Sequence, residues 1–134
     1  MIRHLVPTTL VLAAATVAAT AAPALAATAA PALAAGATRL TLSIVADAGW
    51  ARAVTLRCSP SSGGHPTAAK ACTALKAAGG NPDKLKERHV TCTLQLEPVT
   101  AAVDGTWKGR SVTWSRTFGN SCELSRATAR VFRF

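Results

Sequence analysis

The residues of this chain best suited to chemistry are its four cysteines and three histidines. No Cys-x-x-Cys pair occurs and the histidines are scattered, so we expect no metal site. His65 and His89 could each serve as a base, yet no Gly-x-Ser-x-Gly nucleophile motif accompanies them. We therefore interpret both histidines as solvated loop residues. We expect neither catalytic residues nor a cofactor, and we do not expect an enzyme.

A second feature, the segment 91–98, suggests binding rather than catalysis. It reads Thr-Cys-Thr-Leu-Gln-Leu-Glu-Pro, with apolar side chains at Leu94 and Leu96. Glu97 precedes a proline, and that position favours extended backbone. One interpretation is an exposed segment, tied down at Cys92 and held ready for the cleft of another protein. The other is a sheet strand whose two leucines point into the core.

The N-terminal 26 residues are typical of a secretory signal peptide. An almost wholly apolar run follows Arg3 and His4, and Ala24-Leu25-Ala26 supplies the small residues of a cleavage site. A membrane anchor is the weaker alternative, because the run is mostly alanine and threonine. A second candidate cleavage site ends at Ala34. We expect a secreted, extracellular protein with no membrane attachment after cleavage.

The rest of the chain divides into a flexible Ala/Thr/Pro arm, 27–38, and one domain, 39–134. A domain this small buries a modest core and usually needs further support. In an exported chain an even set of cysteines predicts two disulfides, for which three pairings are possible. The cysteines are Cys58, Cys72, Cys92 and Cys122.

The charge balance favours acidic partners, with fifteen Lys/Arg against six Asp/Glu. The basic residues are spread along the chain, and three Trp, three Phe and no Tyr leave few rings for base stacking. We therefore do not expect nucleic-acid binding. A cationic secreted module that binds anionic cell-surface components is the alternative function.

Alternating apolar residues predict strands, and a run of alanine predicts a helix. We expect one main helix at 67–78, capped by Thr67 and ended by Gly79-Gly80, and a short second helix begun by Asn81-Pro82. Asp104-Gly105 is typical of a hairpin turn. The fold class is α+β, with a five-stranded antiparallel sheet and two disulfides. The expected strands are 39–46, 53–57, 99–103, 106–118 and 129–134.

The order of elements, together with several short motifs, resembles the Streptomyces subtilisin inhibitor family of secreted serine-protease inhibitors. The resemblance covers about 40–134, with all four cysteines in register. The motifs are Arg52-Ala-Val-Thr-Leu-x-Cys58, Gly-x-His65-Pro66, Ala71-Cys72-x-x-Leu75, Val90-x-Cys92, x-Pro98-Val, Val103-Asp-Gly-x-Trp107-x-Gly109, Phe118-x-Asn120-x-Cys122 and Val131-Phe-x-Phe134.

The resemblance implies a tight-binding, substrate-like loop whose scissile bond is Leu94–Gln95. Leu94 would fill the specificity pocket of a subtilisin-like or chymotrypsin-like serine protease. Pro98 would stiffen the loop, and Asn120 would support it by hydrogen bonds; a simple turn asparagine is the alternative for Asn120. The reactive loop would comprise Thr91, Cys92, Thr93, Leu94, Gln95 and Leu96.

The resemblance also implies the disulfides Cys58–Cys72 and Cys92–Cys122, and a homodimer formed through the faces of the sheets. The chain departs from the family pattern at two positions. Thr93 replaces a common proline, and Gln95 is larger and more polar than the usual residue after the scissile bond.

Overall fold

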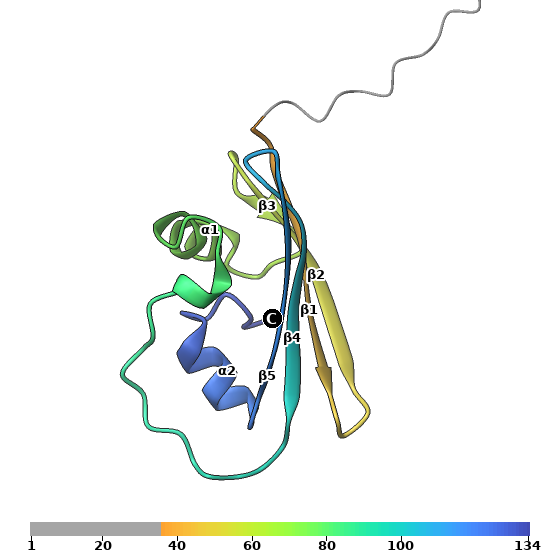
Figure 1. Ribbon diagram of the computed structural model, residues 1–134, viewed down its shortest axis with the longest axis vertical. Coiled ribbons are helices and arrows are strands. Elements are labelled where there is room, and N and C mark those ends of the chain that lie inside the picture. The colour runs from red at the N-terminus through yellow and green to blue at the C-terminus, as the bar shows by residue number, and fades with distance from the viewer. Residues whose placement is uncertain (1–35) are drawn as a thin grey trace, which may run out of the picture.

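The computed structural model describes residues 36–134. The predicted signal peptide, 1–26, and the greater part of the predicted arm, 27–38, lie outside the described residues. The described part forms one five-stranded sheet with helices on one of its faces (Figure 1).

The sheet is antiparallel throughout, which confirms the predicted α+β class and the number of strands. Its strand order is β3-β2-β1-β4-β5. The long strands pair in register because each alternates apolar with polar residues. The strands are β1 (Thr38–Ala46), β2 (Ala51–Cys58), β3 (Ser62–Gly63), β4 (Val99–Trp107) and β5 (Arg110–Phe118).

Two strand predictions were wrong. Segment 129–134 forms turns and coil, and the fifth strand is the two-residue β3, which lies outside all the expected strands. Asp104 and Gly105 lie inside β4, paired with β1, and do not form the hairpin turn. The turn uses Lys108 and Gly109, whose φ values of 48° and 80° suit a tight hairpin.

The helices agree in part with the sequence predictions. The main helix α1 (Ala68–Ala77) is confirmed, although Thr67 occupies the N-cap position without a side-chain capping hydrogen bond. The short second helix is the 3-10 helix η1 (Pro82–Lys84), where the Asn81 side chain accepts from Asp83 N. The helix α2 (Ser121–Ala127), whose N-cap is Asn120, was not predicted from the sequence.

The core fills the space between the sheet and the helices. Every second residue of β1 is buried there, as are alternate residues in the first half of β4; α1 contributes Leu75 and α2 contributes Leu124. The Cys58–Cys72 disulfide ties β2 to α1. Within residues 36–134, no helix lies on the opposite face of the sheet (Figure 1). The buried apolar strand residues are Leu40, Leu42, Ile44, Ala46, Leu56, Val99, Ala101, Val103, Trp107 and Phe118.

His65 is buried, so its prediction as a solvated loop residue was wrong. Its Nδ1 accepts a hydrogen bond from Thr67 N at 3.0 Å, which leaves Nε2 to donate to the Val131 carbonyl at 2.7 Å. The ring also packs edge-on against Phe134, with centroids 5.7 Å apart. His65 therefore anchors the C-terminal tail to the loop before α1, and its role is structural. His89 is exposed, as predicted.

Candidate functional site

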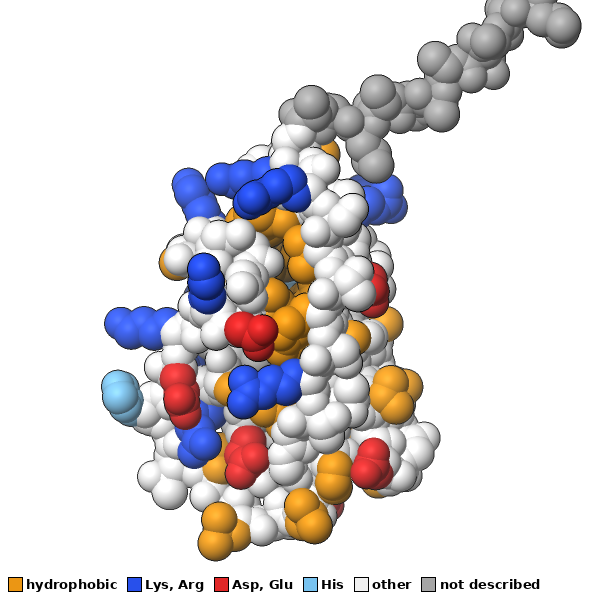
Figure 2. All heavy atoms as spheres, in the orientation of Figure 1, with side chains coloured by type: hydrophobic (Ala, Val, Ile, Leu, Met, Phe, Trp, Pro, Cys, Tyr) orange, Lys and Arg blue, Asp and Glu red, His pale blue; other side chains and the backbone are white. Residues whose placement is uncertain are grey.

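The most exposed apolar residues of the described part lie on one long loop, 86–98. The loop leaves η1, arcs outside α2 and returns to the sheet at β4 (Figure 1). Leu94 is 97% exposed and Leu96 is 78% exposed. The alternative interpretation, a strand with both leucines in the core, is therefore wrong. Figure 2 shows apolar side chains protruding at the bottom of the molecule, the end around which the loop passes in Figure 1.

The disulfide Cys92–Cys122 ties this loop to the first turn of α2. Its Cα atoms lie 5.7 Å apart, and the two cysteines are separated by 30 positions. Both predicted pairings are thereby confirmed. The covalent link fixes the chain two residues before Leu94, so the exposed side chain cannot move far from α2.

The side chain of Asn120 bridges the two sides of the Leu94–Gln95 bond. Its Nδ2 donates to the carbonyl oxygen of Thr93 at 3.2 Å and to that of Gln95 at 2.8 Å. Asn120 is only 6% exposed, so water competes weakly for these hydrogen bonds. Its Oδ1 accepts from Glu123 N at 2.9 Å, which caps α2 and holds the amide in place.

Backbone hydrogen bonds hold the loop on either side of this bridge. On the C-terminal side, Glu97 N donates to the Gly119 carbonyl at 2.9 Å, and the Pro98 carbonyl accepts from Asp47 N at 3.1 Å. On the N-terminal side, Arg88 N donates to the Arg126 carbonyl at 2.9 Å. Most of these anchors therefore belong to one short stretch, 119–126, that contains α2.

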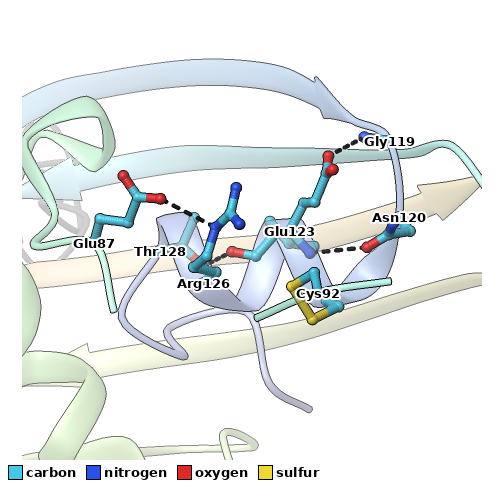
Figure 3. A network of polar contacts seen from close by, with 9 residues as sticks. Glu87, Cys92, Gly119, Asn120, Glu123, Arg126 and Thr128 are labelled. Carbon is cyan, nitrogen blue, oxygen red and sulfur yellow. Dashed lines mark hydrogen bonds and ion pairs between the residues drawn. A yellow bond between two sulfur atoms is a disulfide. The ribbon is translucent and has the colours of Figure 1, made fainter. Parts of the chain in front are cut away.

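A solvent-exposed ion pair between Glu87 and Arg126 lies on the N-terminal side of the loop, with Oε1 and Nε 3.0 Å apart (Figure 3). Both side chains reach solvent, so the pair contributes at most about 1 kcal/mol. The pKa of Arg130 is lowered from its usual value. The largest cause is the positive charge of Arg88, and desolvation and the charge of Arg133 contribute less. Positive charge thus gathers where the loop passes the end of α2.

The side chains after Leu94 also contact one another. Gln95 Nε2 donates to Glu97 Oε1 at 3.1 Å. Pro98 is half-buried and precedes β4 directly. The loop therefore enters the sheet through a residue whose φ is fixed by its ring.

This arrangement is suited to presenting an extended peptide. Residues 36–134 contain no cluster of three His, Cys, Asp or Glu side chains that could hold a metal ion. In the same stretch, no helix has the length and apolar character needed to cross a membrane. What the site offers is a fixed backbone with protruding Leu94 and Leu96.

Gly119, Glu123 and Arg126 were not among the predicted site residues, because α2 was not predicted from the sequence. The signal for that helix was present. Asn120 followed three residues later by Glu123 is a helix-start pattern, whereas Asn120 was considered only as a loop support or a turn residue.

Several known proteins are similar to this chain in sequence and in architecture. The family model "Subtilisin inhibitor-like" matches residues 34–120. Subtilisin inhibitor-like protein 1 of Streptomyces cacaoi is 50% identical over 94 residues, which cover 66% of this chain and 84% of that protein. The subtilase-type protease inhibitor of Streptomyces coelicolor is 49% identical over 85 residues, or 62% of this chain and 59% of that protein.

One similar solved structure is a crystal structure of Streptomyces caespitosus sermetstatin in complex with Bacillus licheniformis subtilisin. Its TM-score to this chain is 0.58 at 30% identity, and the match covers 74% of this chain and 100% of that chain.

Proposed function

The chain belongs to the subtilisin inhibitor-like family, and we propose that it is a secreted inhibitor of subtilisin-like serine proteases. Leu94–Gln95 is the proposed scissile bond, and the loop residues 91–96 lie along the protease's substrate-binding cleft. The proposal rests on one observation: the Leu94 side chain is 97% exposed, on a loop that a disulfide and hydrogen bonds hold on both sides of it.

Because the disulfide and the hydrogen bonds hold the loop in one conformation, a substrate-like segment can inhibit a protease. A flexible peptide loses conformational freedom on entering a protease cleft, whereas a loop already fixed in shape loses little, so its affinity is higher. The protease serine attacks the Leu94 carbonyl carbon, and the peptide nitrogen of Gln95 leaves as an amine. That amine cannot diffuse away, because Asn120 and Gly119 hold residues 95 and 97. It can attack the acyl-enzyme and re-form the peptide bond.

The side chain of Leu94 determines which proteases are inhibited. It is apolar and of medium size, which suits the apolar pockets of subtilisin-like and chymotrypsin-like enzymes. It cannot pair with the buried aspartate of a trypsin pocket. We expect strong inhibition of subtilisin, weaker inhibition of chymotrypsin and little inhibition of trypsin.

A titration of subtilisin with the purified protein tests the function directly. The expected result is stoichiometric loss of protease activity, with slow cleavage confined to Leu94–Gln95, located by mass spectrometry of the complex. Salt-sensitive binding to anionic surfaces without any effect on proteases would instead support the cationic binding module.

A homodimer and an extracellular location are part of the same proposal. The uncovered face of the sheet is mostly polar, with Val45 53% exposed on it, and it could pair with the same face of a second copy. Secretion is supported by the signal-like N-terminus and by two disulfides, which persist in oxidising compartments.

A further inference from the structure

The side chain of Glu123 folds back past the start of its own helix (Figure 3). Its Oε2 accepts a hydrogen bond from Gly119 N at 3.1 Å, while its backbone N donates to Asn120 Oδ1 at 2.9 Å. In the usual pattern at a helix start, a glutamate at this position bonds the N-cap residue itself. Here the carboxylate reaches one residue further back, and Glu123 holds both residues that precede the helix.

These two residues make the loop's hydrogen bonds around the proposed scissile bond. Asn120 donates to the carbonyls of Thr93 and Gln95, and Gly119 accepts from Glu97 N. An amide side chain can face either way. Because Glu123 N binds Oδ1, the Nδ2 donor of Asn120 must point toward the loop.

Residue 119 must be small for this contact to form. A Cβ at Gly119 would lie 2.8 Å from Glu123 Oε2 and 3.4 Å from its carboxyl carbon. A larger residue would push the carboxylate away from the backbone N–H that it binds. The glycine and the glutamate therefore act as one unit.

We infer that Glu123 is a positioning residue for the reactive loop: its carboxylate acts through Gly119, its backbone N acts through Asn120, and neither touches the protease. The inference rests on the proposed function, since the loop that it positions is the proposed inhibitory segment. Its expected consequence is durability of inhibition: with Glu123 in place, the fragments on either side of Leu94–Gln95 stay aligned for the bond to re-form.

The test compares Glu123→Ala and Glu123→Gln with Glu87→Ala. Glu87 is the matched control, because it pairs with Arg126 on the same helix but does not contact Gly119 or Asn120. Two quantities are measured: the rate at which subtilisin cleaves Leu94–Gln95 in the complex, and hydrogen exchange of the Glu97 amide in the free protein.

Glu123→Ala should raise both rates about tenfold, the scale for losing one charge-assisted hydrogen bond. Glu123→Gln should keep both rates close to those of the unmodified protein, because the side-chain oxygen of glutamine still accepts from Gly119 N. Glu87→Ala should change both by less than about twofold. Should Glu123→Ala fail to fold, Gly119→Ala displaces the same carboxylate and should raise both rates.

The outcomes separate this inference from the proposed function. If the unmodified protein inhibits durably and Glu123→Ala matches Glu87→Ala in both rates, the positioning role is overturned and the inhibitor stands. If the unmodified protein leaves subtilisin active while Glu97 exchange still depends on Glu123, the positioning role stands and the inhibitor proposal fails.

Discussion

The Nδ2 atom of Asn120 lies 2.8 Å from the carbonyl oxygen of Gln95, although the two residues are 25 positions apart. The same nitrogen lies 3.2 Å from the carbonyl oxygen of Thr93. One buried side chain thus spans the Leu94–Gln95 bond. Its contacts do not depend on that bond being intact, so a loop cut there would keep a hydrogen bond to each fragment.

Asn120→Asp tests this bridge with little change to the helix. Aspartate caps a helix as well as asparagine does, so the bond from Glu123 N should remain and the melting temperature should change little. The variant has no N–H to donate, and its second oxygen would face the Thr93 and Gln95 carbonyls. Inhibition of subtilisin should weaken by about 2 kcal/mol, the scale of two lost hydrogen bonds, as measured by the inhibition constant. An unchanged inhibition constant would contradict the bridge.

Strand positions were largely predictable from the sequence because alternating residues mark a half-buried strand directly. Leu40, Leu42 and Ile44 repeat every second residue, and all three are buried in β1. The final segment misled the analysis because Val131 and Phe132 are neighbours, yet both are buried. A tail folded into turns can bury consecutive side chains, whereas a strand places them on opposite faces.

The exposed loop was predicted mainly from the family resemblance, because its own eight residues taken alone favoured a strand. Long-range contacts decided between these interpretations. Asn120 contacts Thr93 and Gln95 across 27 and 25 positions of the chain, and the local residue pattern does not reveal contacts of that range. The buried environment of His65 was missed for the same reason, since its partner Val131 is 66 positions away.

The two disulfides should have separable effects. Cys58→Ala with Cys72→Ala removes the link between β2 and α1, remote from the loop, and should lower the free energy of unfolding by about 3 kcal/mol while leaving the loop geometry intact. Cys92→Ala with Cys122→Ala opens a longer loop, for which the chain-entropy cost is about 3.7 kcal/mol, and it also frees the proposed reactive segment. Chemical denaturation gives the stability of each double variant.

The two double variants are then compared in inhibition assays, at a temperature where both are folded. Only the variant lacking Cys92–Cys122 should be cleaved rapidly by subtilisin. Equal cleavage of both variants would indicate that global stability, and not the local tie to α2, protects the loop.

Ala102→Arg tests the proposed dimer. Ala102 lies on β4, between the buried residues Ala101 and Val103, and its side chain points to the uncovered face; Ser43 of β1 is its partner. An arginine there would place two like charges against each other in a symmetric face-to-face dimer. Sedimentation at micromolar concentration should show a dimer for the unmodified protein and a monomer for the variant, with subtilisin inhibition unchanged. A monomer in both cases would exclude the dimer.

Leu94→Lys is the sharpest test of the proposed anchor. The supports from Cys122, Asn120 and Gly119 set the loop's shape, whereas the 97%-exposed side chain of residue 94 makes none of these contacts. A lysine should therefore leave the loop intact and pair with the aspartate of a trypsin pocket. The inhibition constants for subtilisin and trypsin should reverse in order, whereas Leu94→Gly should weaken subtilisin binding by about 2–4 kcal/mol, the scale for a central anchor. Leu96→Lys is the matched control, because it adds the same charge to the same loop and should leave the preference for subtilisin in place. If Leu94→Lys keeps that preference as well, Leu94 is not the anchor and the scissile bond lies elsewhere.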